Sequence, residues 1–366
     1  MTTALLQTID PGLPLPADAP LLLEARSREA QARLDSLTKP QGSLGRLEEL
    51  ARRLYALRGE RPLRVAPAVM LTVAGDHGVA AQKVSPFPQD VTRQMVHNFL
   101  RGGAAVNALC AASGMDLYVV DAGCAGGPFA PHPLLLDRRL GDGTADMSRG
   151  PAMSRKTCLE GLRRGVTLAR ELAARGYRCL GLGEMGIANS TAGAALTCAL
   201  LHLSPEAMAG PGAGADPAMV RHKATVLHQA LTANAGLLDE GDAVDALAAL
   251  GGFELTLMAG LLLGAAAERL PVLVDGFICT AACVAALRIA PEAAPAVFLS
   301  HASAEPGHAR MTAALADLLP APLLRLDMRL GEGTGGAVAY NLLRCAAAVF
   351  NDMATFDEAG VAEKLP

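Results

Sequence analysis

One carboxylate stands inside a cluster of glycines near the end of the chain. The stretch "LGEGTGG" places Glu332 between Gly331 and Gly333, and Gly335 and Gly336 follow at the start of a long helical pattern. A glycine-rich turn before a helix is typical of an anion site, because backbone N–H groups and the positive end of the helix dipole point into the turn. A glutamate has the wrong charge for that function. Glu332 therefore indicates a different chemistry at this turn.

A second glycine-rich stretch, "GLGEMGIANSTAGAAL", lies at the end of an apolar segment. Its glycines match the dinucleotide fingerprint G-x-G-x-x-G, but a helical pattern stands where a dinucleotide fold needs a second strand ending in an acid about 20 residues later. We favour a phosphate site at the start of that helix. Asn189, Ser190 and Thr191 supply amide and hydroxyl donors there, and Gly186 lets the backbone approach a ligand. A capped turn without a ligand is the alternative.

Two other segments carry charged groups beside loops. The "GPGAG" loop at residues 210–214 precedes Lys223, a cation suited to a phosphate or carboxylate, although a solvated charge cluster is the alternative. Asp275 in "DGFICTAA" follows an apolar run. It could accept hydrogen bonds from ribose hydroxyls, or it could cap a helix.

The segment "SHASAEPGHARM" groups His301, Glu305 and His308, which are residue types that bind metals. Their spacing differs from H-E-x-x-H, and Pro306 and Gly307 interrupt the helix that would align them. We therefore expect no metal and no cofactor, and we interpret the segment as a substrate loop lined by Ser and His.

Short apolar segments alternate with Ala-rich helical patterns through most of the chain. Strands that are apolar throughout and alternate with helices predict a parallel sheet covered on both faces, with ligands at the carboxyl ends of the strands. Before them, residues 21–57 carry a helical pattern broken at Pro40 and Gly42, with Ser43 able to cap the second helix. The predicted strands are Ala68–Gly75, Asp116–Gly123, Tyr177–Glu184, Pro271–Gly276, Ala296–His301 and Leu323–Met328.

The composition favours a small-molecule partner. A net charge of −4 without a run of Lys or Arg argues against a nucleic-acid surface. The eight cysteines contain no C-x-x-C pair and mostly lie in apolar segments, which indicates a reducing compartment. The N-terminus lacks the pattern of a secretory signal, and the longest uncharged apolar run, Leu255–Ala267, is shorter than the roughly 18 residues of a membrane span. We expect a cytoplasmic protein that binds neither nucleic acid nor membrane.

Eight segments, in order along the chain, resemble the signature segments of the nicotinate-nucleotide:dimethylbenzimidazole phosphoribosyltransferase family. They are "LTKPQGSLGRLE", "AGDHGV", "SPFPQDVTRQMVHNFLRGGAAVN", "GEMGIANSTAGAAL", "GPGAG", "DGFICTAA", "SHASAEPGH" and "LDMRLGEGTGGAVA". The resemblance implies that the phosphoribosyl group of nicotinate mononucleotide moves to 5,6-dimethylbenzimidazole, giving α-ribazole 5′-phosphate and nicotinate in cobamide biosynthesis.

The same resemblance implies an architecture and an assembly. We expect an α/β fold with a doubly wound, Rossmann-like parallel sheet and a smaller helical domain built from both chain ends. Residues 1–65 and 340–366 are assigned to the helical domain, and residues 66–339 to the large domain that carries the active-site loops. The family also implies a homodimer.

The resemblance further implies the roles of individual residues. Glu332 is the expected catalytic base. The residues expected to bind the acceptor base are Ser85, Gln94, Glu184 and Met185. We add Leu330 to this group from its position beside the glycine turn, where it can cover the face of the ring. The residues expected to bind the phosphoribosyl group are Gly186, Asn189, Ser190, Thr191, Gly212, Gly214, Lys223, Asp275, Ser300 and Ser303.

This reaction explains a carboxylate among glycines. The pyridinium of nicotinate mononucleotide leaves as a neutral ring, whereas the attacking benzimidazole becomes cationic unless a base such as Glu332 removes its N–H proton. The carboxylates Glu184 and Asp275 could stabilise an oxocarbenium-like transition state. Three alternatives stay open: another acceptor such as adenine or a phenol, a non-catalytic nucleotide-binding protein, and a dehydrogenase suggested by "GLGEMG" alone.

Overall fold

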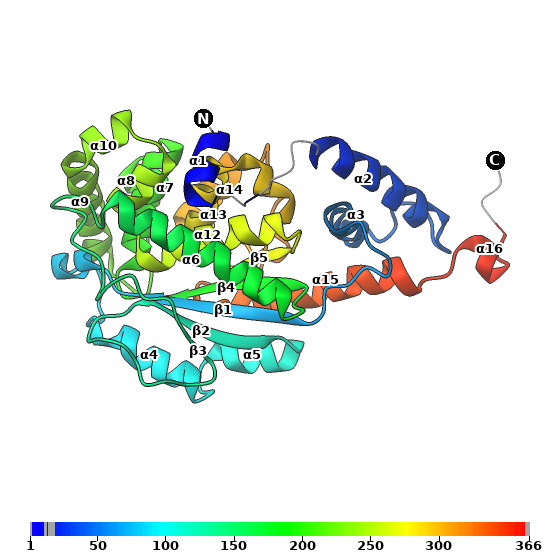
Figure 1. Cartoon of the computed structure of the whole chain (residues 1–366), viewed down its shortest axis with the longest axis horizontal. Helices are drawn as coiled ribbons and strands as arrows, with labels where there is room; N and C mark the ends of the chain where they lie inside the picture. The colour runs from blue at the N-terminus through cyan, green and yellow to red at the C-terminus, as the bar shows by residue number, and fades with distance from the viewer. Residues whose placement is uncertain (1, 11–12, 14–18, 363–366) are drawn as a thin grey trace.

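Six parallel strands form one sheet at the centre of the molecule (Figure 1). The computed structural model describes residues 2–10, 13 and 19–362. The strand order is β3-β2-β1-β4-β5-β6, so the order reverses between β1 and β4. Such a reversal opens a crevice at the carboxyl ends of the two central strands. The strands are β1 (Ala68–Gly75), β2 (Asp116–Gly123), β3 (Leu135–Asp137), β4 (Cys179–Met185), β5 (Val272–Val274) and β6 (Val297–Leu299).

The central strands are apolar because both of their faces are covered. Every residue of β1 is buried, and β4 is buried from Cys179 to Glu184. In the pairing of these two strands, Val73 lies opposite Glu184. The carboxyl ends of β1 and β4 are therefore level, and the loops that follow them begin side by side at the crevice.

Helices pack on both faces of the sheet (Figure 1). On one face α12 and α13 contact the strands, while α6 and α7 pack outside them. The opposite face is covered by α4, α5 and α15. The bounds are α6 (Arg155–Ala174), α7 (Asn189–Leu201), α12 (Phe253–Ala267) and α13 (Phe277–Ile289) on the first face, and α4 (Asp90–Leu100), α5 (Ala105–Ser113) and α15 (Thr334–Asp352) on the second.

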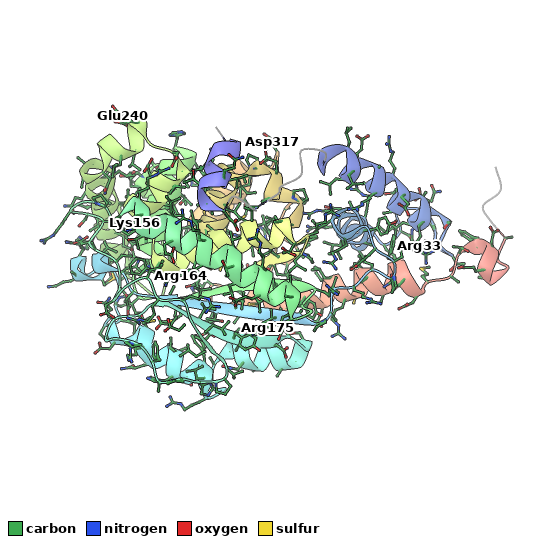
Figure 2. The ribbon with its side chains drawn as sticks, viewed as in Figure 1. Arg33, Lys156, Arg164, Arg175, Glu240 and Asp317 are labelled. Atoms are coloured by element: carbon green, nitrogen blue, oxygen red, sulfur yellow. The ribbon has the colours of Figure 1, made fainter. Side chains whose placement is uncertain are left out.

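The apolar run at residues 255–267 forms most of α12, which is buried nearly all round between the sheet and α6. No helix within the described part of the chain is long and apolar enough to cross a membrane. Charged side chains such as Lys156, Glu240 and Asp317 lie on the exposed outer surface instead (Figure 2). The remaining helical segments are α8 (Pro205–Met208), α9 (Pro217–Ala233), α10 (Ala235–Glu240), α11 (Ala243–Leu250), α14 (Pro306–Ala314) and the two 3₁₀ turns η1 (Gly78–Gln82) and η2 (Pro291–Ala296).

A smaller helical unit projects from one end of the sheet (Figure 1). It contains α2 (Ala19–Ser36), α3 (Arg46–Arg58), the last turns of α15 and α16 (Phe356–Ala359). Arg33 of α2 donates to the carbonyl oxygen of Phe350 in α15 at 2.7 Å, which ties the two chain ends together. The expected α/β class, with a parallel sheet and a helical unit from both chain ends, is confirmed.

The boundaries of this unit differ from the expected ones at two points. The first helix, α1 (Thr2–Ile9), packs on α6 and α13 of the large body, and Arg163 donates to the carbonyl oxygen of Ile9 at 3.0 Å. Helix α15 passes through residue 340 without a break. One continuous helix therefore runs from the crevice into the helical unit.

Two strand predictions need correction. Leu323–Met328 is not a strand, because only Leu324 pairs with His301 in a single bridge and Asp327 has a φ of 54°, which ends any extended course. The short edge strand β3 was not predicted, since three residues after a Pro-rich stretch carry little pattern. Ser43 does not cap α3 either, because Gly45 occupies the cap position.

Candidate active site

A cavity of about 390 Å³ lies at the carboxyl ends of the central strands. Its walls come from the loops after β1, β4, β5 and β6, the loop before α9 and the glycine turn before α15. This is the position that the strand order predicts for a ligand. Its volume is within the range of small-molecule sites.

Glu332 lies in the wall of this cavity with 6 % of its surface exposed. Its backbone has a φ of 65°, which a non-glycine residue rarely adopts. The hydroxyl of Thr72 on β1 donates to its carbonyl oxygen at 2.8 Å. The N–H of Val106 in α5 donates to its Oε2 at 3.2 Å. Within the described chain no hydrogen bond reaches Oε1, so this oxygen is the one available to a ligand.

Glycine is required where the turn meets the end of β4. A Cβ at Gly183 would lie 2.1 Å from the carbonyl oxygen of Glu332, and a Cβ at Gly331 would lie 2.3 Å from Oε1 of Glu184. Gly331 also has a φ of 86°. Both approaches are too close for any side chain, so these glycines allow two carboxylates to face one cavity.

Asp275 fixes this turn from behind. Its Oδ1 accepts from the N–H of Gly335 at 2.7 Å and of Gly336 at 3.2 Å, while Oδ2 accepts from Gly333 at 3.1 Å. The side chain is buried and does not line the cavity. The geometry thus gives Asp275 a holding role in place of the ribose contact expected from its position after a strand.

Burial and, to a smaller extent, the nearby carboxylates of Asp275, Glu254 and Glu332 together raise the pKa of Glu184 to about 8, against a hydrogen bond from the amide of Asn189 that lowers it. Burial likewise raises the pKa of Glu332, while the Val106 N–H acts in the opposite direction. The cavity therefore concentrates negative groups near Glu332 and favours a cationic ligand atom there.

Another part of the cavity wall suits an anion. Helix α7 begins at Asn189, and Ala188, with a φ of 73°, turns the chain so that the helix N-terminus faces the cavity. The buried Nζ of Lys223 donates to Ser190 Oγ at 3.2 Å and to the Gly210 carbonyl oxygen at 3.1 Å. Its third proton has no protein acceptor among the described residues. A helix N-terminus beside an ammonium is a suitable phosphate site.

A third part of the wall is apolar. Phe87 and Leu330, at 47 % and 59 % exposed, are among the most exposed large apolar side chains and both line the cavity. Ser85 adds one hydroxyl, whose oxygen accepts from the N–H of Phe87 at 3.2 Å. The other apolar residues of this wall are Val84, Pro86, Val91, Met95 and Met185. Such a wall suits a flat apolar ring.

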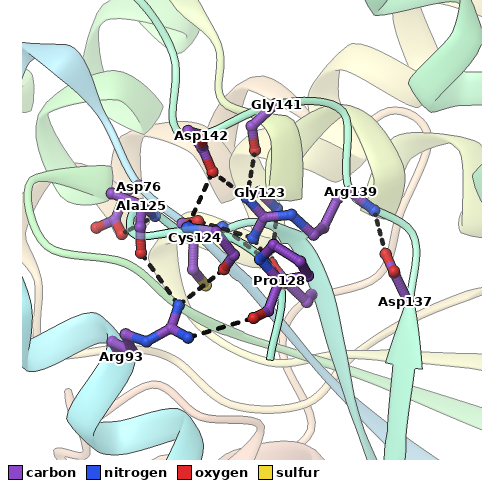
Figure 3. A network of polar contacts seen from close by, with 12 residues as sticks. Asp76, Arg93, Gly123, Cys124, Ala125, Pro128, Asp137, Arg139, Gly141 and Asp142 are labelled. Atoms are coloured by element: carbon purple, nitrogen blue, oxygen red, sulfur yellow. Dashed lines mark hydrogen bonds and ion pairs between the residues drawn. The ribbon is translucent and has the colours of Figure 1, made fainter. Parts of the chain in front are cut away.

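Arg93 ties this wall to the loop after β2 (Figure 3). It extends from α4, donates to the carbonyl oxygen of Ala125 at 3.2 Å, and lies 4.0 Å above the ring of Phe129. Helix α4 also carries Val91 and Met95. The network shown in Figure 3 therefore sets the position of the helix that forms one side of the apolar wall.

The structure brings most of the predicted site residues together. Those that line the cavity are Ser85, Glu184, Met185, Gly186, Asn189, Ser190, Gly212, Lys223, Ser303, Leu330 and Glu332. Those that do not are Gln94, Thr191, Gly214, Asp275 and Ser300. Gln94 and Gly214 are exposed, whereas the hydroxyls of Thr191 and Ser300 are buried and have no hydrogen-bond partner among the residues that the structure describes.

Three charged or titratable residues of the wall received no individual role from the sequence: His301, which was predicted only as part of a substrate loop lined by Ser and His, Glu305 and Arg329. His301 and Glu305 were considered as metal ligands, but within the described chain no cluster of three or more His, Cys, Asp or Glu is placed to hold a metal ion. His308 instead accepts from the N–H of Ser303 at 3.0 Å and contacts Thr280 Oγ1 at 3.0 Å, so it holds the loop. Arg329 carried no sequence signal.

A larger cavity of about 540 Å³ lies elsewhere, against the last turns of α7 and α13. Its Arg155 is bound to both oxygens of Asp242, at 2.8 and 2.7 Å. Those charges already satisfy each other, and the cavity is distant from the strand ends. We therefore place the active site in the cavity that contains Glu332.

The fold and this cavity define a class of enzyme. A family described as Phosphoribosyltransferase matches residues 20–361, and the chain belongs to that family. The chain is similar to the nicotinate-nucleotide–dimethylbenzimidazole phosphoribosyltransferase of Nitratidesulfovibrio vulgaris strain DP4, with 58 % identity over 91 % of this chain and 93 % of the relative. The enzyme of that name from Oleidesulfovibrio alaskensis is 54 % identical over 91 % of this chain and 92 % of the relative.

A solved structure agrees with these relatives. The crystal structure of CobT from Thermus thermophilus superposes with a TM-score of 0.88 at 44 % identity, covering 93 % of this chain and all of the other. The family resemblance drawn from the eight segments is therefore confirmed.

Proposed function

We propose that this chain transfers the phosphoribosyl group of nicotinate mononucleotide to 5,6-dimethylbenzimidazole, with Glu332 as the general base. The relatives that carry the name of this enzyme support the reaction. The observation that supports the catalytic role is the geometry of Glu332, which lines the cavity with its Oε2 held by Val106 and with no hydrogen bond to Oε1 from the described residues.

The chemistry divides between two ends of the cavity. At the anion-binding end, the N-terminus of α7, Ser190 and the remaining proton of Lys223 bind the phosphate of the mononucleotide. At the apolar end, Phe87 and Leu330 enclose the acceptor ring beside Ser85. The ribose C1′ then lies between them, near the two carboxylates that Gly183 and Gly331 admit.

Proton removal is the step that needs the protein. Nicotinate leaves from a pyridinium as a neutral ring, so its departure needs no acid. One ring nitrogen of the benzimidazole attacks C1′ as the bond to nicotinate breaks, and Oε1 of Glu332 takes the proton from the other nitrogen. A positioned base typically contributes about 10²–10⁴ in rate. Attack from the face opposite nicotinate inverts C1′ from β to α.

Glu184 supports the charge that develops on the ribose. Its pKa is raised to about 8 by burial and by neighbouring carboxylates, so it binds a proton when no cation is present. A pyridinium or an oxocarbenium-like centre beside it favours the ionised form, and the same coupling stabilises that cation. Asp275 contributes by holding the turn that carries Glu332.

The test is an assay of purified protein with nicotinate mononucleotide and 5,6-dimethylbenzimidazole, following nicotinate release and the anomer of the product by chromatography and NMR. Formation of an α-linked riboside phosphate supports the proposal. If no acceptor is ribosylated, with adenine and phenols included, a nucleotide-binding function is the better conclusion. If product forms only with adenine or a phenol, the proposed mechanism stands and the identity of the acceptor is revised.

We also propose that the enzyme is a cytoplasmic homodimer. Leu326, at 52 % exposed, and the cavity residue Leu330, at 59 %, are two exposed apolar side chains in the same segment. A second copy would cover such side chains. Light scattering coupled to size exclusion tests this, and a monomer at micromolar concentration would contradict it.

A further inference from the structure

We propose that the N-terminus of α5 is a positioning element for the catalytic base: the Val106 N–H fixes Oε2 of Glu332, stabilises its ionised form and leaves Oε1 as the proton acceptor. This inference rests on the proposed role of Glu332. It assigns a function to a helix that contributes no side chain to the cavity lining.

The start of α5 lacks a local cap for this N–H. Ala104 occupies the cap position and has no side-chain oxygen, and the amide oxygen of Asn107 accepts from the N–H of Ala104 at 3.0 Å. The N–H of Val106 donates instead to Oε2 of Glu332, which lies 226 residues later in the chain. Both residues are buried. The first turn of a helix leaves N–H groups unpaired, so a carboxylate from outside the helix supplies the missing acceptor.

The contact also matters for the carboxylate. Asp275, behind β5, and Glu184, on β4, are the charged groups that couple to Glu332, and both are acidic. Among the described residues no ion pair involves Glu332, and the Val106 N–H is the one hydrogen bond to its carboxylate. The N–H and the helix dipole of α5 are therefore what offsets burial and repulsion.

Geometry is fixed by the same contact. Thr72 holds the carbonyl oxygen of Glu332 at 2.8 Å and Asp275 holds the turn, so the backbone is set from two sides. Val106 then sets the side chain. A base whose second oxygen is anchored presents one oxygen in one orientation, which favours proton transfer over a freely rotating carboxylate.

The test removes this N–H while keeping an apolar side chain. Val106→Pro does so, and proline is tolerated in the first turn of a helix. The expected result is an acid limb of the kcat/KM profile that moves to higher pH by about one to two units, the effect of losing one hydrogen bond to a charged group. Ala105→Pro is the matched control, because Ala105 is the neighbouring, exposed position in the same turn and the hydrogen bond to Glu332 comes from the N–H of Val106. If the acid limb lies at the same pH in both variants and in the parent enzyme, the proposal is overturned.

A second measurement covers the case in which Val106→Pro does not fold, since proline disfavours helical backbone at the residue before it. In ¹⁵N-valine-labelled parent protein, one amide should titrate with the midpoint of the kinetic acid limb, and its titration should vanish in Glu332→Gln. Absence of such an amide would overturn the proposal. If Glu332→Gln kept full kcat while that amide titrated in the parent, the contact would stand and the general-base role in the proposed function would fail.

Discussion

Oδ1 of Asp275 accepts a hydrogen bond from the N–H of Gly335 at 2.7 Å, although the two residues are 60 positions apart in the chain. The glycine turn before α15 thus binds an anion, as such turns do, but the anion is a side chain of the protein. The carboxylate of Glu332 instead accepts from the N–H of Val106 at the N-terminus of α5. Each of two helix N-termini therefore has its own carboxylate, and one of the two carboxylates lines the cavity.

Asp275→Asn should loosen the turn that carries Glu332. The amide can offer one oxygen to the three N–H groups, and its own NH₂ would face the others. We expect kcat to fall at least about tenfold and the unfolding free energy to fall by about 1–3 kcal/mol. Kinetics and urea unfolding measure both. Asp317→Asn, on the exposed surface, is the control. An unchanged kcat would show that the turn keeps its geometry without this carboxylate.

Glu332→Gln should separate catalysis from structure. The glutamine oxygen can still accept from the N–H of Val106, so the local fold should survive. Because the amide cannot take a proton, kcat should fall by about 10²–10⁴. The dissociation constant of nicotinate mononucleotide, measured by calorimetry, should change less than about threefold. Equal losses in binding and kcat would point to misfolding of the turn.

Lys223→Met should weaken binding of the phosphate. The buried ammonium holds Ser190 and Gly210, and its remaining proton is the one offered to a ligand. Loss of a charged hydrogen bond should raise KM for nicotinate mononucleotide by about 10- to 100-fold. The same substitution should change the KM for nicotinate riboside, which lacks the phosphate, far less. Equal effects on both substrates would assign Lys223 to the structure of the loop alone. Lys156→Met serves as the exposed control.

Gly331→Ala should damage the site through sterics. The new Cβ would lie 2.3 Å from Oε1 of Glu184 and would need a φ of 86°. We expect kcat to fall at least about tenfold and stability by about 1–3 kcal/mol. Gly236→Ala is the matched control, since Gly236 lies in α10 and, apart from its chain neighbours and its own helix backbone, no atom of the described residues lies within 4 Å of its Cβ position. A fully active Gly331→Ala enzyme would mean that the turn and Glu184 are not held as close as the structure has them.

The central strands of the fold were predictable because their hydrophobic pattern is contained within a few consecutive residues. β1 and β2 have the predicted bounds: β1 is buried throughout, as its nearly continuous apolar run predicts, and β2 is buried from Val119 to Gly123. Leu323–Met328 failed because its apolar residues are half-exposed beside β6, and the φ of Asp327 is not visible in a pattern. β3 failed because an edge strand of three residues has no periodicity to detect.

Site residues were predictable where the function depends on the type of side chain. They were less predictable where the function depends on a contact that only the folded chain creates. Glu332 and Lys223 were identified from their types and their loops, Glu184 was assigned through the family resemblance, and all three line the cavity. The contact between Val106 and Glu332 had no sequence signal, because any residue has an N–H and only the fold brings this one to the turn. The holding role of Asp275 was hidden for the same reason.

Glu184→Gln should change the dependence of stability on pH in a defined direction. In the folded protein the pKa of Glu184 is raised from 4.5 to about 8, mainly by burial. Between those two pH values the unfolded chain has released a proton that the folded protein retains, so this group costs stability as the pH rises. Glutamine has no proton to lose and can still accept from Asn189. The difference in unfolding free energy, variant minus parent, should therefore increase by up to about 1.4 kcal/mol per pH unit across this window and stay constant above it.

Urea unfolding at several pH values measures this difference, and Glu240→Gln is the control for the loss of an exposed carboxylate. A difference that stays constant with pH would show that Glu184 is ionised in the empty site, and its response to a bound cation would then have to come from direct attraction alone.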